Sequence, residues 1–315
     1  MGANSFKPGQ IWLDTSGSPI QAHGGGMLFN QGTYYWFGEN KDGRTGPGAL
    51  ADLHRVDVIG INCYSSEDLY NWKNEGIVLG AVRDDPASDL HPSRVVERPK
   101  VIYNAATGKY VMWLHIDTAD YGLSRAGVAI ADSPVGPYRY LGSFHPHGAM
   151  SRDMTIFQDE DGTAYQMFAS DGNRTMRVSA LSDDYLRPSG APTRIFANRF
   201  REAPAIFKRH GRYYVITSGC TGWDPNAAEC AAARHVLGPW RSMGNPCRGL
   251  GTEHTFSAQG TCVLPVAGQP DRYIFMADIW NKHNLSDSRY AWLPIRFEGE
   301  RPVIEWLNEW NLETP

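Results

Sequence analysis

The feature that most constrains the fold of this chain is a unit that recurs along it: a polar residue, a short apolar run, a polar turn and an aromatic-rich run. Its clearest copy begins at Arg201-Glu202-Ala203-Pro204, turns at Gly211 and continues through Tyr213–Ile216. Two such runs joined by a glycine-containing turn are typical of a β-hairpin. Pro204 favours extended geometry at Ala203, so Glu202 is predicted to enter its strand in a defined direction.

The same unit begins at four further polar positions: Gln21, Glu97, Asp153 and Gln259. Each copy is followed by apolar runs that predict a third and a fourth strand. From Glu97 onward the leading polar residues recur at intervals of roughly 50 residues, which marks the blades of a β-propeller. We therefore predict an all-β fold, a five-bladed β-propeller in a single domain over residues 1–315. A two-domain sandwich is the alternative.

The C-terminal segment is predicted to complete the last blade. The runs Tyr290–Ile295 and Ile304–Trp306 supply two of its strands, and we expect further strand material from Ile11–Leu13. The innermost strand of every propeller blade lines the central channel. Polar residues that lead the innermost strands should therefore meet at one mouth of that channel, although they lie far apart in sequence.

Composition narrows the class of ligand. Charged residues make up 20% of the chain and the formal net charge is −4, so no basic field points to nucleic acid or to an anionic membrane. Ten Trp and fifteen Tyr suit either a packed core or the flat CH faces of sugars. No apolar run approaches the roughly 20 residues of a membrane helix. We expect a monomer that acts on an oligo- or polysaccharide.

The N-terminal residues 1–10 contain no apolar core, so no signal peptide is visible; an extracellular or periplasmic location is expected only if one was removed. The five cysteines follow no metal-binding spacing. One disulfide among Cys220, Cys230 and Cys247 is possible, and partly buried reduced thiols are the alternative. No acidic loop typical of a calcium site is present, and we predict neither a required metal nor a cofactor.

The predicted channel mouth gathers His23, Glu97, Asp153, Glu202 and Gln259. Carboxyl groups around a cleft with aromatic walls are what glycoside hydrolysis needs, because one acid protonates the leaving oxygen while a group on the opposite face activates or positions water. Clustered carboxylates raise the pKa of one member and keep it protonated near neutral pH.

These positions also resemble a known family. The five units, Asp153, the Arg201-Glu202-Ala203-Pro204 stretch and the outer-strand motifs are similar, over nearly the whole chain, to family 43 glycoside hydrolases, which are inverting five-bladed propellers. Further motifs resemble the exo-β-1,3-galactanase branch: Gln21–Gly26, Tyr34–Trp36, Glu97–Val101, Ser257–Thr261, Asp278–Trp280 and Tyr290–Pro294. The resemblance implies release of galactose or short galactosides from β-1,3-galactan, the arabinogalactan backbone.

The resemblance also implies roles for single residues. The usual family pattern has an Asp base at the start of blade one, where this chain has Gln21-Ala22-His23-Gly24 and no acidic residue. By resemblance, Glu202 is the general acid, Asp153 holds its pKa and orientation, and Gln259 orients the water. Glu97 binds sugar hydroxyls or assists that water. A neutral amide is a poor base, so Gln259 must act through hydrogen bonds or an unusual tautomer.

Substrate-binding side chains are expected at His23, Glu39, Tyr121, Asn173, Thr221, Trp223 and Trp280. His23 is either a substrate contact or a structural hydrogen-bonding residue. Two other functions compete with galactan hydrolysis: an α-L-arabinofuranosidase or galactofuranosidase on the same scaffold, and a non-catalytic sugar-binding propeller. The missing Asp favours the non-catalytic protein, whereas the presence of both Asp153 and Glu202 argues against it.

Overall fold

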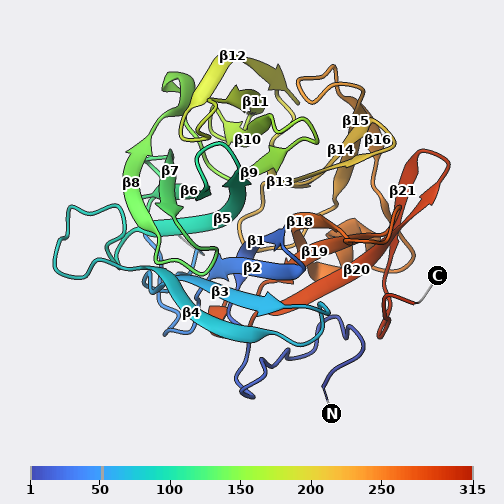
Figure 1. Cartoon of the computed structure of the whole chain (residues 1–315), viewed down its shortest axis with the longest axis horizontal. Helices are drawn as coiled ribbons and strands as arrows, with labels where there is room; N and C mark the ends of the chain where they lie inside the picture. The colour runs from blue at the N-terminus through green and yellow to red at the C-terminus, as the bar shows by residue number, and fades with distance from the viewer. Residues whose placement is uncertain (1, 51–52, 314–315) are drawn as a thin grey trace.

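The computed structural model describes residues 2–50 and 53–313, which form five sheets arranged as blades around a ring (Figure 1). The predicted five-bladed β-propeller is confirmed. Within each of blades 1 to 4 the strands pair antiparallel in chain order, as short apolar runs joined by tight turns dictate. In the part of the chain that is described, no helix is both long and apolar enough to span a membrane.

The first four blades each contain four strands. Blade 1 contains β1 (His23–Asn30), β2 (Thr33–Glu39), β3 (Gly60–Ser66) and β4 (Lys73–Gly80). Blade 2 contains β5 (Val95–Asn104), β6 (Lys109–Asp117), β7 (Arg125–Ala131) and β8 (Arg139–Phe144). Blade 3 contains β9 (Met154–Gln158), β10 (Ala164–Ser170), β11 (Thr175–Leu181) and β12 (Pro188–Ile195). Blade 4 contains β13 (Arg201–Arg209), β14 (Arg212–Gly219), β15 (Glu229–Ala233) and β16 (Arg241–Gly244).

Blade 5 is built differently from the prediction. It contains β18 (Gln259–Pro265), β19 (Tyr273–Ile279), β20 (Arg289–Glu298), β21 (Arg301–Glu305) and, outermost, β17 (Cys247–Arg248), which pairs parallel with β21. The expected contribution of Ile11–Leu13 is wrong, because Leu13 only forms an isolated bridge with Pro19. The short 3-10 helices of the described chain are η1 (Pro146–Gly148), η2 (Thr252–Ser257) and η3 (Leu285–Asp287).

The innermost strands close the ring. β1 contacts β5, β5 contacts β9, β9 contacts β13, β13 contacts β18, and β18 returns to β1. The strands β1, β5 and β13 carry a β-bulge directly after a predicted site residue, with positive φ at Gly24 (60°), Arg98 (56°) and Ala203 (50°). The predicted extended geometry of Ala203 is therefore wrong. A bulge bends its strand and re-aims the adjacent side chain, here toward the channel mouth.

Aromatic side chains fill the interface between blades 5 and 1. One buried cluster contains Phe6, Trp36, Trp72, Trp292 and Trp310, with Trp12 packed against it. Trp113 is buried in a second cluster, and Trp240 and Trp306 pack against two others, so core packing accounts for eight of the ten tryptophans. All five cysteines lie within the described residues and are free thiols, so the disulfide alternative is not realised.

Candidate active site

A cavity at the channel mouth collects residues from all five blades. The four residues predicted to be catalytic line it together: Glu97, Asp153, Glu202 and Gln259. Each comes from the first strand of a different blade or, for Asp153, from the residue just before that strand. The repeat in the sequence therefore becomes a cluster in space.

Glu202 is held by two amide groups. Asn173 Nδ2 donates to its Oε2 over 3.0 Å, and Gln259 Nε2 donates to its Oε1 over 3.2 Å. Burial and the negative charge of Asp153 raise the pKa of Glu202 to about 8, although the positive charge of Arg98 opposes them. A carboxyl group with this pKa is protonated at neutral pH, as a general acid must be.

Asp153 lies between Arg98 and the backbone of blade 4. Its Oδ2 accepts a hydrogen bond from Ala203 N (3.1 Å) and pairs with the Arg98 guanidinium at 2.9 Å. It therefore touches the residue that follows the acid and adds a like charge beside Glu202. This is the placement of a group that sets pKa and orientation rather than one that transfers the proton.

Gln259 has every hydrogen-bonding position of its amide occupied. Its Oε1 accepts from Arg98 (2.6 Å) and from the indole of Trp280 (3.1 Å). Its Nε2 donates to Glu202 and to Ser218 Oγ (3.0 Å). A side-chain amide can accept two and donate two hydrogen bonds, so these four partners saturate it.

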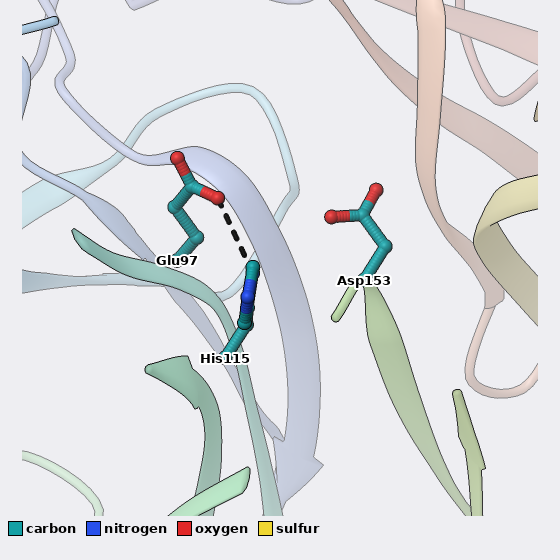
Figure 2. Close-up of side chains that lie close together, drawn as sticks. All are labelled: Glu97, His115 and Asp153. Carbon is teal, nitrogen blue, oxygen red and sulfur yellow. Dashed lines mark ion pairs between the residues drawn. The ribbon is translucent and has the colours of Figure 1, made fainter. Parts of the chain in front are cut away.

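Glu97 is a second carboxyl group of the cavity, and it is ionised. Its Oε1 accepts from the hydroxyl of Tyr121 (2.9 Å), and its Oε2 lies 3.4 Å from His115 Nδ1, the contact shown as a dashed line in Figure 2. Burial alone raises the pKa of Glu97, but the hydrogen bond with His115 and the charge of Lys41 lower it to about 2. Glu97 and Glu202 therefore titrate far apart and can take opposite roles.

His115 is itself held from behind. Its Nε2 donates to Asp117 Oδ2 over 2.9 Å, and Asp117 Oδ1 accepts from the backbone N–H groups of residues 118, 123 and 124. Burial would lower the pKa of His115, but Asp117 and Glu97 raise it to about 9. Asp117 thus orders both the imidazolium and the loop that carries Tyr121.

One group of potential metal ligands occurs in the described part of the chain. Atoms of Glu97, His115 and Asp153 lie within 4.8 Å of one another, and Figure 2 shows the three side chains around a common space. A metal ligand must be deprotonated, whereas His115 is protonated near neutral pH and Asp153 already pairs with Arg98. These residues fit a hydrogen-bonded site better than a metal site.

Five of the seven predicted substrate-binding residues line the cavity: Glu39, Tyr121, Asn173, Trp223 and Trp280. Trp223 and Trp280 pack edge to face with ring centroids 4.8 Å apart and form an aromatic wall. Thr221 is exposed, and its hydroxyl donates to Asp224 O within its own loop. His23 is fully buried behind Trp280, stacked on Tyr290. The structure therefore places Thr221 and His23 outside the cavity lining.

Sequence reasoning missed other residues that line the cavity: Leu50, Leu53, Arg98, His115, Arg152 and Cys220. Arg98 directly follows a predicted catalytic residue, and its positive φ re-aims it; nothing in the sequence signals that bulge. The pattern His115-x-Asp117 at the end of a strand could have been noticed as a pair on one face. Leu50 and Leu53 belong to a long loop between β2 and β3. The loop sequence shows no helical or strand periodicity that would predict where its side chains lie.

Comparisons with known proteins point to one family. The model of glycosyl hydrolases family 43 matches residues 26–259. The family 43 β-1,3-galactosidase BT3683, solved with galactodeoxynojirimycin, is 42% identical with a TM-score of 0.90 and covers 98% of this chain and 100% of its own. The exo-β-1,3-galactanase of Phanerochaete chrysosporium, solved with β-1,3-galactotriose, is 36% identical with a TM-score of 0.90, covering 99% of this chain and 69% of its own.

Curated relatives are more distant. The arabinoxylan arabinofuranohydrolase of Paenibacillus polymyxa is 27% identical over an alignment of 212 residues that covers 60% of this chain and 32% of that protein. The β-D-galactofuranosidase xynD of Aspergillus niger is 26% identical over an alignment of 212 residues that covers 61% of this chain and 60% of that protein. The matches thus span less than two thirds of the length of these curated relatives.

Proposed function

The chain belongs to family 43 of the glycosyl hydrolases, and from that premise we propose that it is an inverting, exo-acting hydrolase of β-1,3-galactan. It would release galactose or short galactosides from that polymer. The observation that carries the proposal is the pairing, in one cavity, of a carboxyl group with a pKa of about 8 and an ionised carboxylate. Similar solved structures are a β-1,3-galactosidase and an exo-β-1,3-galactanase.

On the acid side, Glu202 donates its proton to the leaving oxygen. Asn173 and Gln259 orient its carboxyl group, and the charge of Asp153 helps to keep it protonated. General acid catalysis of this kind contributes about 10²–10⁴-fold to the rate.

On the water side, Gln259 orients the nucleophile and Glu97 assists it or binds sugar hydroxyls. Both Oε1 lone pairs of Gln259 are occupied, so it can hold water only through its Nε2 hydrogens, once one of their present contacts is released. A donor cannot accept the proton that the water loses. That proton therefore goes to a carboxylate that lines the cavity, and Glu97, which its low pKa keeps ionised, is the candidate that the variant Glu97→Gln tests.

A single catalytic domain over residues 1–315, acting as a monomer, completes the proposal. The fold is consistent with it, since each blade is one contiguous segment and the inner strands form a closed ring. Size-exclusion chromatography with light scattering tests the monomer: a mass near 35.0 kDa is expected, and twice that mass would contradict it.

Product analysis tests the substrate. The purified protein is incubated with β-1,3-galactan, with an aryl α-L-arabinofuranoside and with an aryl galactofuranoside. Galactose or short galactosides from the first substrate, with an inverted anomeric configuration in the first ¹H NMR spectra, is the expected result. Hydrolysis of a furanoside alone would assign the site to the activity that two curated relatives carry in their names.

A further inference from the structure

We propose that Arg98 is a positioning residue that fixes the amide orientation of Gln259, so that only its Nε2 hydrogens face the reaction. The inference rests on the proposed function, because it concerns the water side of the same site. It starts from the contacts of one buried guanidinium that sequence reasoning did not single out.

Arg98 connects four blades although its side chain is only 7% exposed. One terminal nitrogen lies 2.6 Å from Gln259 Oε1 and 2.9 Å from Asp153 Oδ2, and the other donates to Gly260 O over 3.1 Å. Its backbone N–H donates to Glu39 Oε1 over 3.0 Å. Burial would lower the pKa of Arg98, but the charges of Asp153 and other carboxylates raise it, so the donor stays charged.

The orientation of an amide depends on its partners, because its oxygen and nitrogen ends have nearly the same shape. Arg98 and the indole of Trp280 are donors only, and both face the same end of Gln259. If the amide were flipped, its N–H groups would point at two donors. The guanidinium and the indole therefore select the orientation in which the oxygen faces them.

The same two donors exclude the imidic acid tautomer of Gln259 in this arrangement. That tautomer carries a hydroxyl on the oxygen, and the hydroxyl proton would meet the N–H groups of Arg98 and Trp280, whose nitrogens lie 2.6 and 3.1 Å from that oxygen. Only the amide form, or an anion stabilised by the guanidinium charge, keeps both contacts. Gln259 thus meets the reaction through its Nε2 end, next to Glu202 and Ser218.

The bulge in β5 makes this contact possible. Consecutive side chains in a regular strand point to opposite faces, which would send Arg98 away from the cavity that Glu97 lines. The register shift between Glu97 and Lys100, with a φ of 56° at Arg98, brings both side chains to the cavity. A non-glycine residue in this conformation is strained, and it persists only where the surroundings enforce it.

The test compares Arg98→Ala and Arg98→Lys with a matched arginine. Arg201 precedes Glu202 as Arg98 follows Glu97; it is partly buried and bound to Thr217, and it does not line the cavity. We expect Arg98→Ala to lower kcat on galactosides by about 10²-fold with KM changed less than about threefold. Arg201→Lys should keep kcat within about threefold.

Two further readouts separate positioning from a structural role. The loss of kcat in Arg98→Ala should be the same for substrates with good and with poor leaving groups, because the acid Glu202 is intact. Addition of millimolar guanidinium should restore part of the lost kcat. Arg98→Lys keeps the positive charge but loses the planar guanidinium with its several N–H donors. Its kcat should therefore remain at least tenfold below that of the wild type. A loss that vanishes with a good leaving group, full activity of Arg98→Lys, or no rescue by guanidinium would overturn the proposal.

A measurement without turnover keeps the inference distinct from the proposed function. The side-chain NH₂ resonances of Gln259, assigned by NMR, should show a single protected conformer in the wild type and in Arg201→Lys. In Arg98→Lys they should become averaged or exchange faster with solvent. If the wild type hydrolyses no galactoside, the proposed function fails while this result still decides the role of Arg98; unchanged resonances would end that role.

Discussion

In blade 1 the inner strand begins with His23 and Gly24, and in blade 4 Glu202 and Ala203 directly follow the first strand residue, Arg201. Both strands bulge there, and the second residue has a positive φ in each. The N–H of Gly24 donates to Asp278 Oδ2 (2.7 Å), and that of Ala203 donates to Asp153 Oδ2 (3.1 Å). In both cases a carboxylate of the preceding blade accepts the N–H group that the bulge leaves unpaired.

The two blades differ in the side chain that precedes the bulge. Blade 4 turns a carboxyl group into the cavity, whereas blade 1 buries an imidazole against Tyr290. A Cβ on Gly24 would lie 2.2 Å from Glu39 Oε1, so that position has no room for a side chain. The bulge and the carboxylate that accepts its N–H group are thus common to both blades. Whether the position can act as an acid depends on the residue just before the bulge, which is His23 in blade 1 and Glu202 in blade 4. Blade 1 can lack an acidic residue without losing its backbone geometry.

The sharpest test of this contrast removes the acid from blade 4. Glu202→Gln keeps the shape of the side chain but cannot donate a proton to the leaving oxygen. We expect kcat on β-1,3-galactobiose to fall by about 10²–10⁴-fold while binding of galactose survives. Activity on an aryl galactoside with an acidic leaving group should recover in part. A loss below tenfold on the disaccharide would remove Glu202 from this role.

The second test asks which residue acts on the water in place of the missing Asp of blade 1: Gln259 of blade 5 or Glu97 of blade 2. Gln259→Ala should lower kcat by about 10²-fold with little change in KM, because the water is no longer held in line. Glu97→Gln should mainly raise KM if it binds sugar hydroxyls. Steady-state kinetics of the two variants side by side decides the point: a kcat loss in Glu97→Gln larger than that in Gln259→Ala would make Glu97 the base.

The third test concerns the charge that blade 3 places next to blade 4. Because Glu202 must be protonated, kcat/KM should fall as the pH rises through about 8. The charge of Asp153 raises that pKa, so Asp153→Asn should move the basic limb to lower pH, in addition to a loss of about tenfold. The pH profile of kcat/KM for both proteins is the measurement. If the basic limb of the pH profile does not move in Asp153→Asn, burial alone sets the pKa of Glu202.

The smallest effects are expected from the backbone itself. Gly24→Ala should lower the free energy of unfolding by about 1–3 kcal/mol, because the new Cβ meets Glu39 and a non-glycine residue must adopt a φ of 60°. Ala203→Gly should change it by less than about 1 kcal/mol, since glycine accepts a φ of 50° without strain. Urea denaturation compares the two; equal effects would mean that the bulges are not equivalent.

The sequence was informative where one signal repeats. Equivalent polar residues at the starts of successive blades had to converge, so Glu97, Asp153, Glu202 and Gln259 could be grouped without coordinates. Inferences from neighbouring residues alone were wrong where the backbone departs from regular strand geometry. Pro204 suggested an extended Ala203, but the carboxylate of Asp153 from another blade holds it in a bulge.

Arg98 was missed for the same reason. Its neighbour Glu97 was predicted to face the channel, and strand periodicity then turns Arg98 away. Only the tertiary contacts with Glu39, Asp153 and Gln259 reverse that direction. The last outer strand could not be predicted either, because β17 is a two-residue segment that pairs parallel, and its pairing depends on where blade 5 ends in space.

That outer strand has a consequence for how the ring stays shut. Because β17 precedes β18 in the chain, every sheet of the described residues is made from one continuous segment, and none of these sheets joins the first and last blades. The N-terminal segment meets the C-terminal segment through an isolated bridge between Phe6 and Trp310, a hydrogen bond from Ser5 to Glu309 and an ion pair between Lys7 and Glu309. The aromatic cluster, together with cross-blade hydrogen bonds such as that from Gly24 to Asp278, therefore holds blades 5 and 1 together. Slow opening of the propeller should begin at this interface, because the chain runs directly from each blade to the next but makes no such connection from blade 5 back to blade 1.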